Sequence, residues 1–290
     1  MVKNILEILV TGSFGFIGRH ISNALLERGD KVRRFDAAHN NDLRDQDSVM
    51  NAIKGVDAVV HLGALAEVTY SFERPSEVAS VNIIGTINVL EACRKFDVRK
   101  FIFASSSSVY GAPEKLPVSE DDSLKPVTPY GLTKLVGEQY AELYHELYGL
   151  KVICLRYLNV YGSGQARGIV GDSLNAIRNG KPVVVFGDGK QTRDFVHVSD
   201  VVQANLLSLD SNDTSTGIYN IGTGVETSIL DLINLVQNLT GTHKIEYGPK
   251  RIGDIERFCA DISRAKSELK YRPKVSLREG LLQTITAKQA

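Results

Sequence analysis

The sequence lacks an excess of either charge: its 290 residues carry 34 basic and 34 acidic side chains. This balance argues against a general nucleic-acid binder or a membrane-surface protein, because such proteins usually carry a basic excess or stripe. No apolar run approaches the roughly 20 residues needed to span a bilayer, and the amino terminus lacks the apolar stretch of a signal peptide. We therefore expect a cytoplasmic protein without a nucleic-acid or membrane partner.

Cysteines are also few, and Cys93, Cys154 and Cys259 are scattered along the chain. An odd, widely spaced set fits neither a disulfide framework nor a metal site, so we expect buried, reduced thiols. The six histidines show no ligand spacing either, and no metal is predicted.

What the first half does contain is a regular alternation of apolar runs and helical patterns. Strands are expected at 8–10, 31–35, 57–62, 100–104 and 151–156, a first helix that ends near residue 28, and strong helices at Glu77–Phe96 and Tyr130–Tyr148. Alternation of this kind predicts an α/β fold with a Rossmann-like, doubly wound parallel sheet. After about Asn159 the pattern becomes irregular, which indicates a smaller lobe that is interleaved with the sheet.

A glycine-rich turn, Thr11-Gly-Ser-Phe-Gly-Phe-Ile-Gly18, joins the first strand to the first helix. Gly12 allows a tight turn, Gly15 lets the backbone approach a pyrophosphate, and Gly18 lets the helix pack closely on the sheet. The helix N-terminus then offers free N–H groups to phosphates. Asp36 ends the second strand, where a carboxylate accepts both ribose hydroxyls and repels the 2′-phosphate of NADP. The pattern favours NAD; the alternative is that the glycines serve only a tight turn.

A serine-rich segment ends the fourth strand, at the sheet edge where ligands bind in such folds. Tyr130 and Lys134 follow, one helical turn apart on one face. A phenol has a pKa of about 10, so it acts as a base near neutrality only when an ammonium group and an oxidised nicotinamide stabilise the phenolate. Ser106 would hydrogen-bond the reacting oxygen and relay its proton. For Ser107 and Ser108, a turn that satisfies its own backbone is an equal alternative.

Taken in order, these motifs resemble the extended short-chain dehydrogenase/reductase family, and within it the nucleotide-sugar epimerases of the UDP-glucose 4-epimerase type. The resemblance covers essentially the whole chain. It is carried by the segments TGSFGFIG, DLRD, HLGALAEV, VNIIGTINVLEA, SSSSVYG, PYGLTK, LRYLNVYG, FGDGKQTRDFVHVSDV and RIGD.

The resemblance implies a catalytic trio of Ser106, Tyr130 and Lys134 and a tightly bound NAD that is recycled in place. It implies an NAD-binding domain at 1–158, with return segments near 190–222, and a mainly nucleotide-sugar-binding lobe at 159–290. The cofactor-binding residues that it implies, together with those of the glycine turn, are Gly12, Phe14, Gly15, Phe16, Ile17, Gly18, Asp36, Asp42, Leu43, Leu62, Gly63, Ala64, Ala66, Asn82, Ser105, Tyr130, Lys134, Tyr157 and Leu158.

The resemblance also implies a UDP-sugar substrate. Its nucleotide diphosphate would be held by Asn159, Arg193, Arg251 and Asp254, with Ile169, Val170, Val184 and Phe186 around the base. A structural ion pair with Asp194 or Asp200 is the alternative for Arg193, and a plain core role is the alternative for the apolar residues. Phe258 corresponds to a position where bulk limits the room for an N-acetyl group, so glucose and galactose are favoured as the sugar.

Three departures from the family pattern stand out. Ser13-Phe14 replaces the usual small pair, so that Phe14 would crowd or cover the phosphates; only 37–41 separate Asp36 from Asp42; and Gly63 stands where alanine is common. None of these touches the catalytic trio.

The expected reaction is inversion at C4 of a UDP-sugar through a 4-keto intermediate. The alternatives are a UDP-glucuronate or UDP-N-acetylglucosamine 4-epimerase, a 4-keto-sugar reductase and, more distantly, a non-catalytic dinucleotide sensor. Apolar residues on more than one face of the two long helices match the family's four-helix homodimer interface. Coverage of these helices by the chain's own C-terminal lobe is the alternative.

Overall fold

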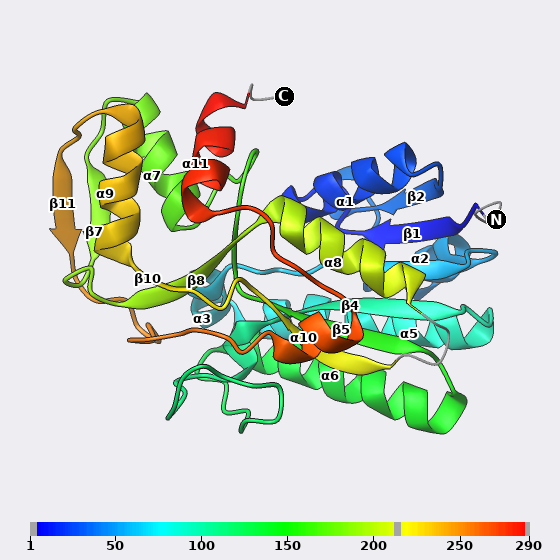
Figure 1. The fold of residues 1–290 in the computed structure, drawn as a ribbon. Coiled ribbons are helices and arrows are strands. Elements are labelled where there is room, and N and C mark those ends of the chain that lie inside the picture. Colours follow the sequence, from blue (N-terminus) through cyan, green and yellow to red (C-terminus); the bar gives the residue numbers. More distant parts are fainter. Residues whose placement is uncertain (1–4, 212–215, 288–290) are drawn as a thin grey trace.

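The structure is a computed structural model that describes residues 5–211 and 216–287. Residues 1–4 of the amino terminus and 212–215 of the expected return segment lie outside the description. At its centre is a six-stranded parallel sheet with helices on both faces, which confirms the predicted fold class (Figure 1). The strand order is β2-β1-β3-β4-β5-β9, with bounds Lys31–Phe35, Glu7–Thr11, Ala58–His61, Lys100–Ser106, Val152–Tyr157 and Gly217–Ile221.

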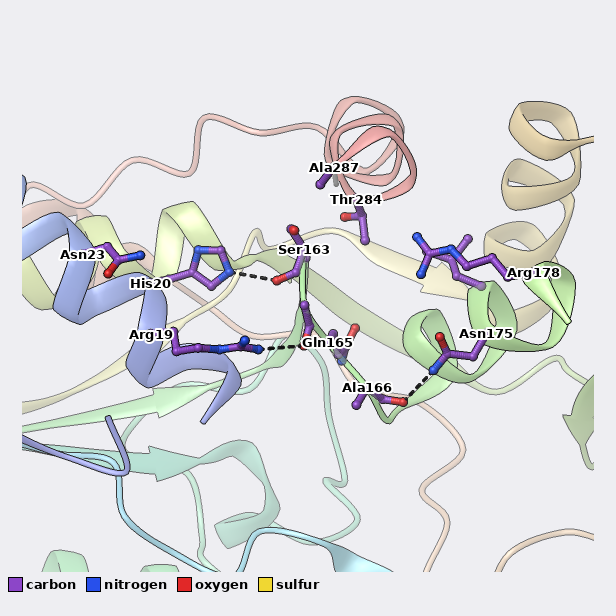
Figure 2. Close-up of a pocket in the computed structure, with 13 residues that line it drawn as sticks. Arg19, His20, Asn23, Ser163, Gln165, Ala166, Asn175, Arg178, Thr284 and Ala287 are labelled. Atoms are coloured by element: carbon purple, nitrogen blue, oxygen red, sulfur yellow. Dashed lines mark hydrogen bonds between the residues drawn. The ribbon is translucent and has the colours of Figure 1, made fainter. Parts of the chain in front are cut away.

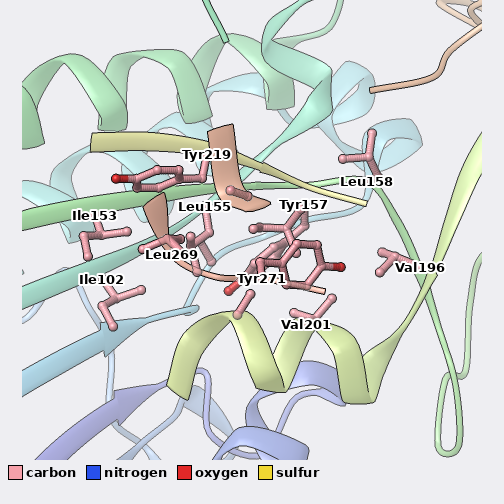
Figure 3. Packing of buried hydrophobic residues seen from close by; sticks show 14 of the residues in the cluster. Ile102, Ile153, Leu155, Tyr157, Leu158, Val196, Val201, Tyr219, Leu269 and Tyr271 are labelled. Carbon is pink, nitrogen blue, oxygen red and sulfur yellow. The ribbon is translucent and has the colours of Figure 1, made fainter. Parts of the chain in front are cut away.

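The strands contribute side chains to two separate cores, because successive side chains point to opposite faces of a sheet. In β4, Phe101 and Phe103 face one core, whereas Ile102 and Ala104 face the other. Figure 3 shows part of the second core, where residues of β5 pack against α8 (Val198–Asp210) and the C-terminal segment around Tyr271. This two-sided burial is why the strands read as continuous apolar runs.

The helices form a layer on each face of the sheet (Figure 1). Helices α1 (Phe16–Glu27) and α8 (Val198–Asp210) cover one face, and α2 (Gln46–Ile53), α5 (Gly85–Lys95) and α6 (Pro129–Tyr148) cover the other. Short elements complete this half: α3, α4 and the two 3₁₀ turns, at Val68–Glu73, Pro75–Ala79, Ala37–His39 and Ser107–Val109.

The expected continuous helix Glu77–Phe96 is wrong in one respect. A π-helical segment, Ser80–Ile84, interrupts it between α4 and α5. The wider turn presents Asn82 to the chain beside it, where its side chain accepts from Leu65 N at 2.8 Å and donates to Leu65 O at 3.1 Å. Helical periodicity does not reveal such a bulge, because it depends on these contacts with a distant segment.

The second half of the chain builds a smaller lobe beside the sheet and also returns to the sheet, because β9 pairs with β5. The lobe has a three-stranded sheet, a two-stranded sheet and three helices around its own core (Figure 1). The bounds, in the order β6, β8, β10, β7, β11, α7, α9, α11 and then the separate α10, are Asn159–Tyr161, Thr192–His197, Glu226–Ser228, Val183–Phe186, Ile245–Gly248, Ile169–Arg178, Ile229–Thr240, Leu277–Thr286 and Ser263–Glu268. The division at residue 158 stays an interpretation.

Within the described ranges, none of the helices combines the length and apolar character that a membrane crossing requires. All three cysteines are buried free thiols.

Candidate active site

The glycine turn at the end of β1 has the geometry that a phosphate cradle requires. Gly12 has a φ of 66°, and a Cβ at Gly18 would fall onto the Gly12 carbonyl oxygen, so neither position accepts a side chain. Gly15 begins α1 without any side-chain cap, which leaves first-turn N–H groups free for an anion. The Ser13 hydroxyl in the same turn is buried and has no hydrogen-bond partner among the described residues. These residues therefore fit the pyrophosphate of a dinucleotide.

At the adenosine end of the turn, Asp36 ties two segments together. Its carboxylate accepts from Phe14 N at 2.8 Å and from Ala38 N at 2.9 Å, and lone pairs remain for ribose hydroxyls. The Phe14 ring packs on the His39 ring, with centroids 4.2 Å apart, and the Arg34 guanidinium lies 5.1 Å from its centroid. That Phe14 crowds or covers the phosphates stays a prediction.

The segment after β3 is held close to the turn by buried polar groups. The Thr11 hydroxyl accepts from Leu62 N and Gly63 N, at 3.1 and 3.0 Å, and lies 2.7 Å from His61 Nδ1. His61 Nε2 in turn lies 3.0 Å from the Thr86 hydroxyl. Burial lowers the pKa of His61 to about 3, so its imidazole is neutral and serves as a hydrogen-bond link.

Some predicted cofactor residues have structural tasks in this region. Leu43 is 7% exposed and belongs to the core, where it fills the space beside Gly63. Asp42 pairs with Arg44, and this pair holds the pKa of the Asp42 carboxyl below its usual range. Contacts of Asp42 and Leu43 with the adenine stay predictions, as do those of the other cofactor residues, Phe16, Ile17, Ala64, Ala66, Tyr157 and Leu158.

The structure brings the three predicted catalytic residues to one place, the carboxyl end of β4. Ser106 ends that strand and accepts from Ser108 N at 3.1 Å. Thr128 caps α6 by accepting from Gly131 N at 2.9 Å. Because Pro129 follows at the first helical position, the helix start is doubly specified and Tyr130 sits in the first turn.

Lys134 is anchored one turn further along α6. Its ammonium donates to Ala104 O at 2.8 Å and lies 5.0 Å from the Phe103 ring and 6.0 Å from the Tyr130 ring. Burial raises the pKa of Tyr130 to about 12, and a hydrogen bond with Ser106 acts against this rise. Burial lowers the pKa of Lys134 to about 8, and the charge of Glu138 acts in the opposite direction. Burial of the pair thus opposes ionisation of both groups.

In the smaller lobe, the structure brings together two predicted diphosphate ligands. Arg193 forms an ion pair with Asp254, and both side chains are 15% exposed. The alternative pairings of Arg193 with Asp194 or Asp200 are wrong. Asp194 accepts from Thr223 and Gly224, and Asp200 accepts from the backbone of 274–275.

The remaining predicted substrate residues occupy different environments. The Arg251 guanidinium stacks 3.9 Å above the Phe186 ring, and a cavity of about 370 Å³ borders Asp254. Val184 is 42% exposed. Val170 is buried in the core of the smaller lobe, and Phe258 is buried in the core that Ile102 and Ala104 of β4 face. Phe258 packs against Tyr110 with ring centroids 5.9 Å apart. The substrate roles of these residues, and of Asn159 and Ile169, stay predictions.

A second cavity of about 370 Å³ lies between the two lobes, away from the catalytic trio. Figure 2 shows that α1, the loop 162–166, α7 and α11 line it. Hydrogen bonds cross from one lobe to the other at its floor, from Arg19 to Gly164 O at 3.3 Å and between His20 Nε2 and Ser163 O at 2.9 Å. No predicted site residue lines this cavity; its cross-lobe bonds instead hold the loop that follows Asn159 in place.

Sequence reasoning missed a buried polar cluster behind the catalytic trio. Glu138 of α6 accepts two hydrogen bonds from Arg156 of β5, at 2.9 and 2.7 Å, and a third from Ser105. Two signals were available in the sequence. Glu138 continues the four-residue spacing of Tyr130 and Lys134, and Arg156 is a charged residue inside an apolar strand.

Comparison with known proteins agrees with this geometry. The model of the NAD-dependent epimerase/dehydratase family matches residues 8–222. The UDP-glucose 4-epimerase of Mycolicibacterium smegmatis is 35% identical over 306 residues, covering 97% of each chain. The crystal structure of a Thermotoga maritima UDP-glucose 4-epimerase with UDP-glucose has a TM-score of 0.91 at 36% identity, covering 97% of each chain. A Bacillus cereus UDP-glucuronic acid 4-epimerase in complex with UDP-glucuronic acid and NAD has a TM-score of 0.91 at 32% identity, covering 97% and 98%.

The fold and the site define an NAD-dependent enzyme of the extended short-chain dehydrogenase/reductase type. With the family model matching most of its length, the chain belongs to the NAD-dependent epimerase/dehydratase family, and NAD is its cofactor.

Proposed function

We propose that this protein is a UDP-sugar 4-epimerase and that UDP-glucose and UDP-galactose are its substrates. The observation that carries the proposal is the arrangement of Ser106, Tyr130 and Lys134 around the carboxyl end of β4, beside a cradle that fits a dinucleotide. In this arrangement one phenol can exchange a proton with a sugar hydroxyl whose carbon faces the nicotinamide.

The protein's own residues supply the proton transfers. Tyr130, as phenolate, accepts the proton of the sugar 4-hydroxyl through or beside Ser106, and Lys134 stabilises the phenolate. NAD supplies the hydride acceptor and, after the keto sugar has turned over, the hydride donor. The hydride would return to the opposite face of C4 while Tyr130 returns the proton to the oxygen on that carbon, so that the cycle ends with the same charges with which it began.

Free rotation of the sugar requires that the enzyme hold the nucleotide diphosphate firmly and the ring loosely. We assign the diphosphate to Arg193 and Arg251, whose guanidinium forks match phosphate oxygens. Arg193 is already held by Asp254 and by Ile255 O at 2.6 Å, and Arg251 is stacked on Phe186. Both cations therefore need little reorganisation on binding.

Two sequence features favour a 4-epimerase over its siblings. A dehydratase needs further acid and base groups after Ser106, where this chain has Ser107 and Ser108. Phe258 packs against Tyr110, whose hydroxyl donates to Asn220 at 2.7 Å. The bulk of the Phe258 ring favours glucose and galactose over sugars with an N-acetyl group. Relatives named for glucose and for glucuronic acid lie at similar identity, so a UDP-glucuronate or UDP-N-acetylglucosamine epimerase and a 4-keto-sugar reductase remain the alternatives to test.

A panel of UDP-, dTDP- and GDP-sugars, incubated with purified protein without added cofactor, tests this function. We expect UDP-galactose to form from UDP-glucose, with NAD copurifying. Faster turnover of UDP-N-acetylglucosamine or UDP-glucuronate would replace the sugar assignment. A requirement for added NAD(P)H would indicate the reductase, and no absorbance of bound NADH with any sugar would indicate a sensor.

We further propose that the protein is a cytoplasmic homodimer, paired through α5, α6 and the π-helical segment. Apolar side chains on this face remain exposed, with Ile84 at 49%, Leu143 at 43% and Leu147 at 61%. In Figure 1 the helices α7, α9 and α11 of the smaller lobe lie away from α5 and α6. A second copy would pair the two helices of each chain into a four-helix contact.

A further inference from the structure

Helix α6 carries a buried carboxylate to which the proposed reaction assigns no step. Tyr130, Lys134 and Glu138 are spaced four residues apart, so they lie on one face of the helix. The Glu138 side chain is only 3% exposed. A glutamate is almost never buried this deeply unless it is paired.

The partners of Glu138 fix both its position and its charge. Arg156 approaches with two nitrogens, Nε at 2.9 Å from Oε1 and Nη2 at 2.7 Å from Oε2. Ser105, which directly precedes the catalytic serine, donates its hydroxyl to Oε1. The other guanidinium nitrogen of Arg156 donates to the Tyr110 hydroxyl at 2.8 Å and to Glu120 O at 3.1 Å. Glu138 therefore forms a buried, two-point ion pair with Arg156 and cannot change rotamer without breaking this cluster.

Charges of alternating sign then follow one another behind the site: a phenolate at Tyr130, an ammonium at Lys134, a carboxylate at Glu138 and a guanidinium at Arg156. The first two groups can share one proton in two ways. Either Tyr130 is a neutral phenol beside a neutral amine, or Tyr130 is a phenolate beside an ammonium; the proton count is the same, and only the second form is a base.

We propose that Glu138 is a positioning residue that holds the shared proton on Lys134 and thereby keeps Tyr130 in its reactive, ionised form. The proposal rests on the proposed function, since it concerns the same proton transfer. Its physical basis is distance. The negative charge lies one helical turn from Lys134 and two turns from Tyr130, so it favours a proton on the nearer group.

Among the described residues, strands β3 and β5 present no competing charge that changes near neutrality. From β3, His61 faces Lys134 and is kept neutral by burial. From β5, Cys154 is buried, its pKa is raised well above the usual range, and Arg156 stays protonated. Further along α6, Glu142 is exposed, so solvent screens it.

The size of the effect follows from Coulomb's law. With roughly 6 Å for one turn, roughly 11 Å for two, and an effective dielectric constant of about 20, the charge of Glu138 favours the reactive form about tenfold. Removal of this charge makes the site less negative overall. The pKa at which the Tyr130–Lys134 pair loses its first proton therefore falls by about one or more.

The test is the Glu138→Gln variant of the NAD-loaded enzyme, which keeps the shape and removes the charge. We expect kcat on the alkaline plateau to fall by up to about tenfold and the acidic limb of the pH profile of kcat/KM to move to lower pH. NAD content and the KM for the sugar nucleotide should change by less than about twofold. A loss caused only by poorer packing lowers the plateau and leaves the acidic limb where it was, and that result, or a plateau within twofold of the parent, overturns the proposal.

Two variants on the same elements control for the substitution itself. Glu142→Gln makes the same chemical change one turn further along α6 and should leave both the plateau and the limb in place. Glu138→Asp retains the charge and should restore the limb. If Glu138→Gln does not fold because Arg156 is left unpaired, the double variant Glu138→Gln/Arg156→Gln removes both charges; its limb should move in the same direction by less, and an unmoved limb overturns the proposal.

A measurement without sugar separates this proposal from the proposed function. Ultraviolet absorbance of the phenolate, taken as the difference between each protein and its Tyr130→Phe counterpart, reports the ionised tyrosine directly. We expect a smaller plateau amplitude in Glu138→Gln than in the parent, even if no tested sugar is epimerised. Equal amplitudes would overturn the role of Glu138 and leave the epimerase assignment standing.

Discussion

The contact between α6 and β4 allows a demanding test of how the catalytic helix is placed. Gly137 has no side chain, and a Cβ there would lie 2.5 Å from Cζ of Phe103 and 3.0 Å from Cε1. Phe103 is 1% exposed, stacks on His61 and lies beneath the ammonium of Lys134. To accept the methyl group of Gly137→Ala, the buried ring must shift or the helix and the strand must move apart.

The magnitude follows from this contact. Carbon atoms pack at about 3.5–4.0 Å, so the added methyl requires a displacement of about 1 Å. Over-packing of a filled core costs about 1–3 kcal/mol of unfolding free energy. A misplacement of about 1 Å between reacting groups can reduce the rate by about a hundredfold. We therefore expect a thermal midpoint lower by several degrees and a kcat lower by ten- to a hundredfold, while the glycine turn still binds NAD.

The assay compares kcat, NAD content and thermal unfolding in Gly137→Ala, in Phe103→Leu and in Gly137→Ala/Phe103→Leu. Leucine lacks the ring atoms that the new methyl meets, so the double variant should regain part of the lost stability and activity. If Gly137→Ala has the parent's kcat and midpoint, the helix is not held at this distance by the glycine. A double variant that is worse than both single variants would show that the ring is not the obstacle.

Three further outcomes are expected elsewhere in the molecule. Burial lowers the pKa of His61 to about 3 from its ordinary value of about 6.5, so the unfolded chain binds a proton that the folded chain does not, and stability falls as the pH drops below about 6.5. In urea unfolding, the stability of His61→Gln should therefore fall by about 2 kcal/mol less than that of the parent between pH 7 and 5, and an equal fall would refute the linkage. Lys100 donates to Ser208 O at 3.0 Å and to Ser211 O at 2.7 Å at the end of α8. Lys100→Met should therefore lower the free energy of unfolding in urea by about 2–4 kcal/mol and leave the kcat of the folded fraction unchanged. Leu143→Glu should convert a dimer into a monomer in light scattering, whereas an unchanged mass would place the interface elsewhere.

Five strands of the sheet and the closeness of Ser106, Tyr130 and Lys134 could be predicted, because each depends on short-range patterns. Continuous apolar runs mark doubly buried strands, and β4, Lys100–Ser106, covers the predicted range 100–104. The pair Tyr130 and Lys134 was found because a helix fixes which residues share a face, and Pro129 marks where that helix begins.

The features that sequence reasoning missed depend on contacts between distant segments. The π-helical segment exists because Asn82 reaches Leu65 and Thr133, and no local periodicity reports such contacts. The ring of Phe14 could be noticed as unusual, but its packing on His39 depends on how the short segment after Asp36 turns. The pairing of Arg193 with Asp254 likewise joins residues of a strand and a loop that no spacing rule connects.

The return of the chain in β9 has a consequence for how the molecule can be divided. Because β9 lies against β5, removal of the second half of the sequence would uncover a full row of unpaired backbone groups at the edge of the sheet. The second half of the chain therefore supplies a strand of the central sheet. A fragment that stops at residue 158 would tend to aggregate through the open edge. An exchange of domains between relatives would have to transfer β9 together with the first half of the chain.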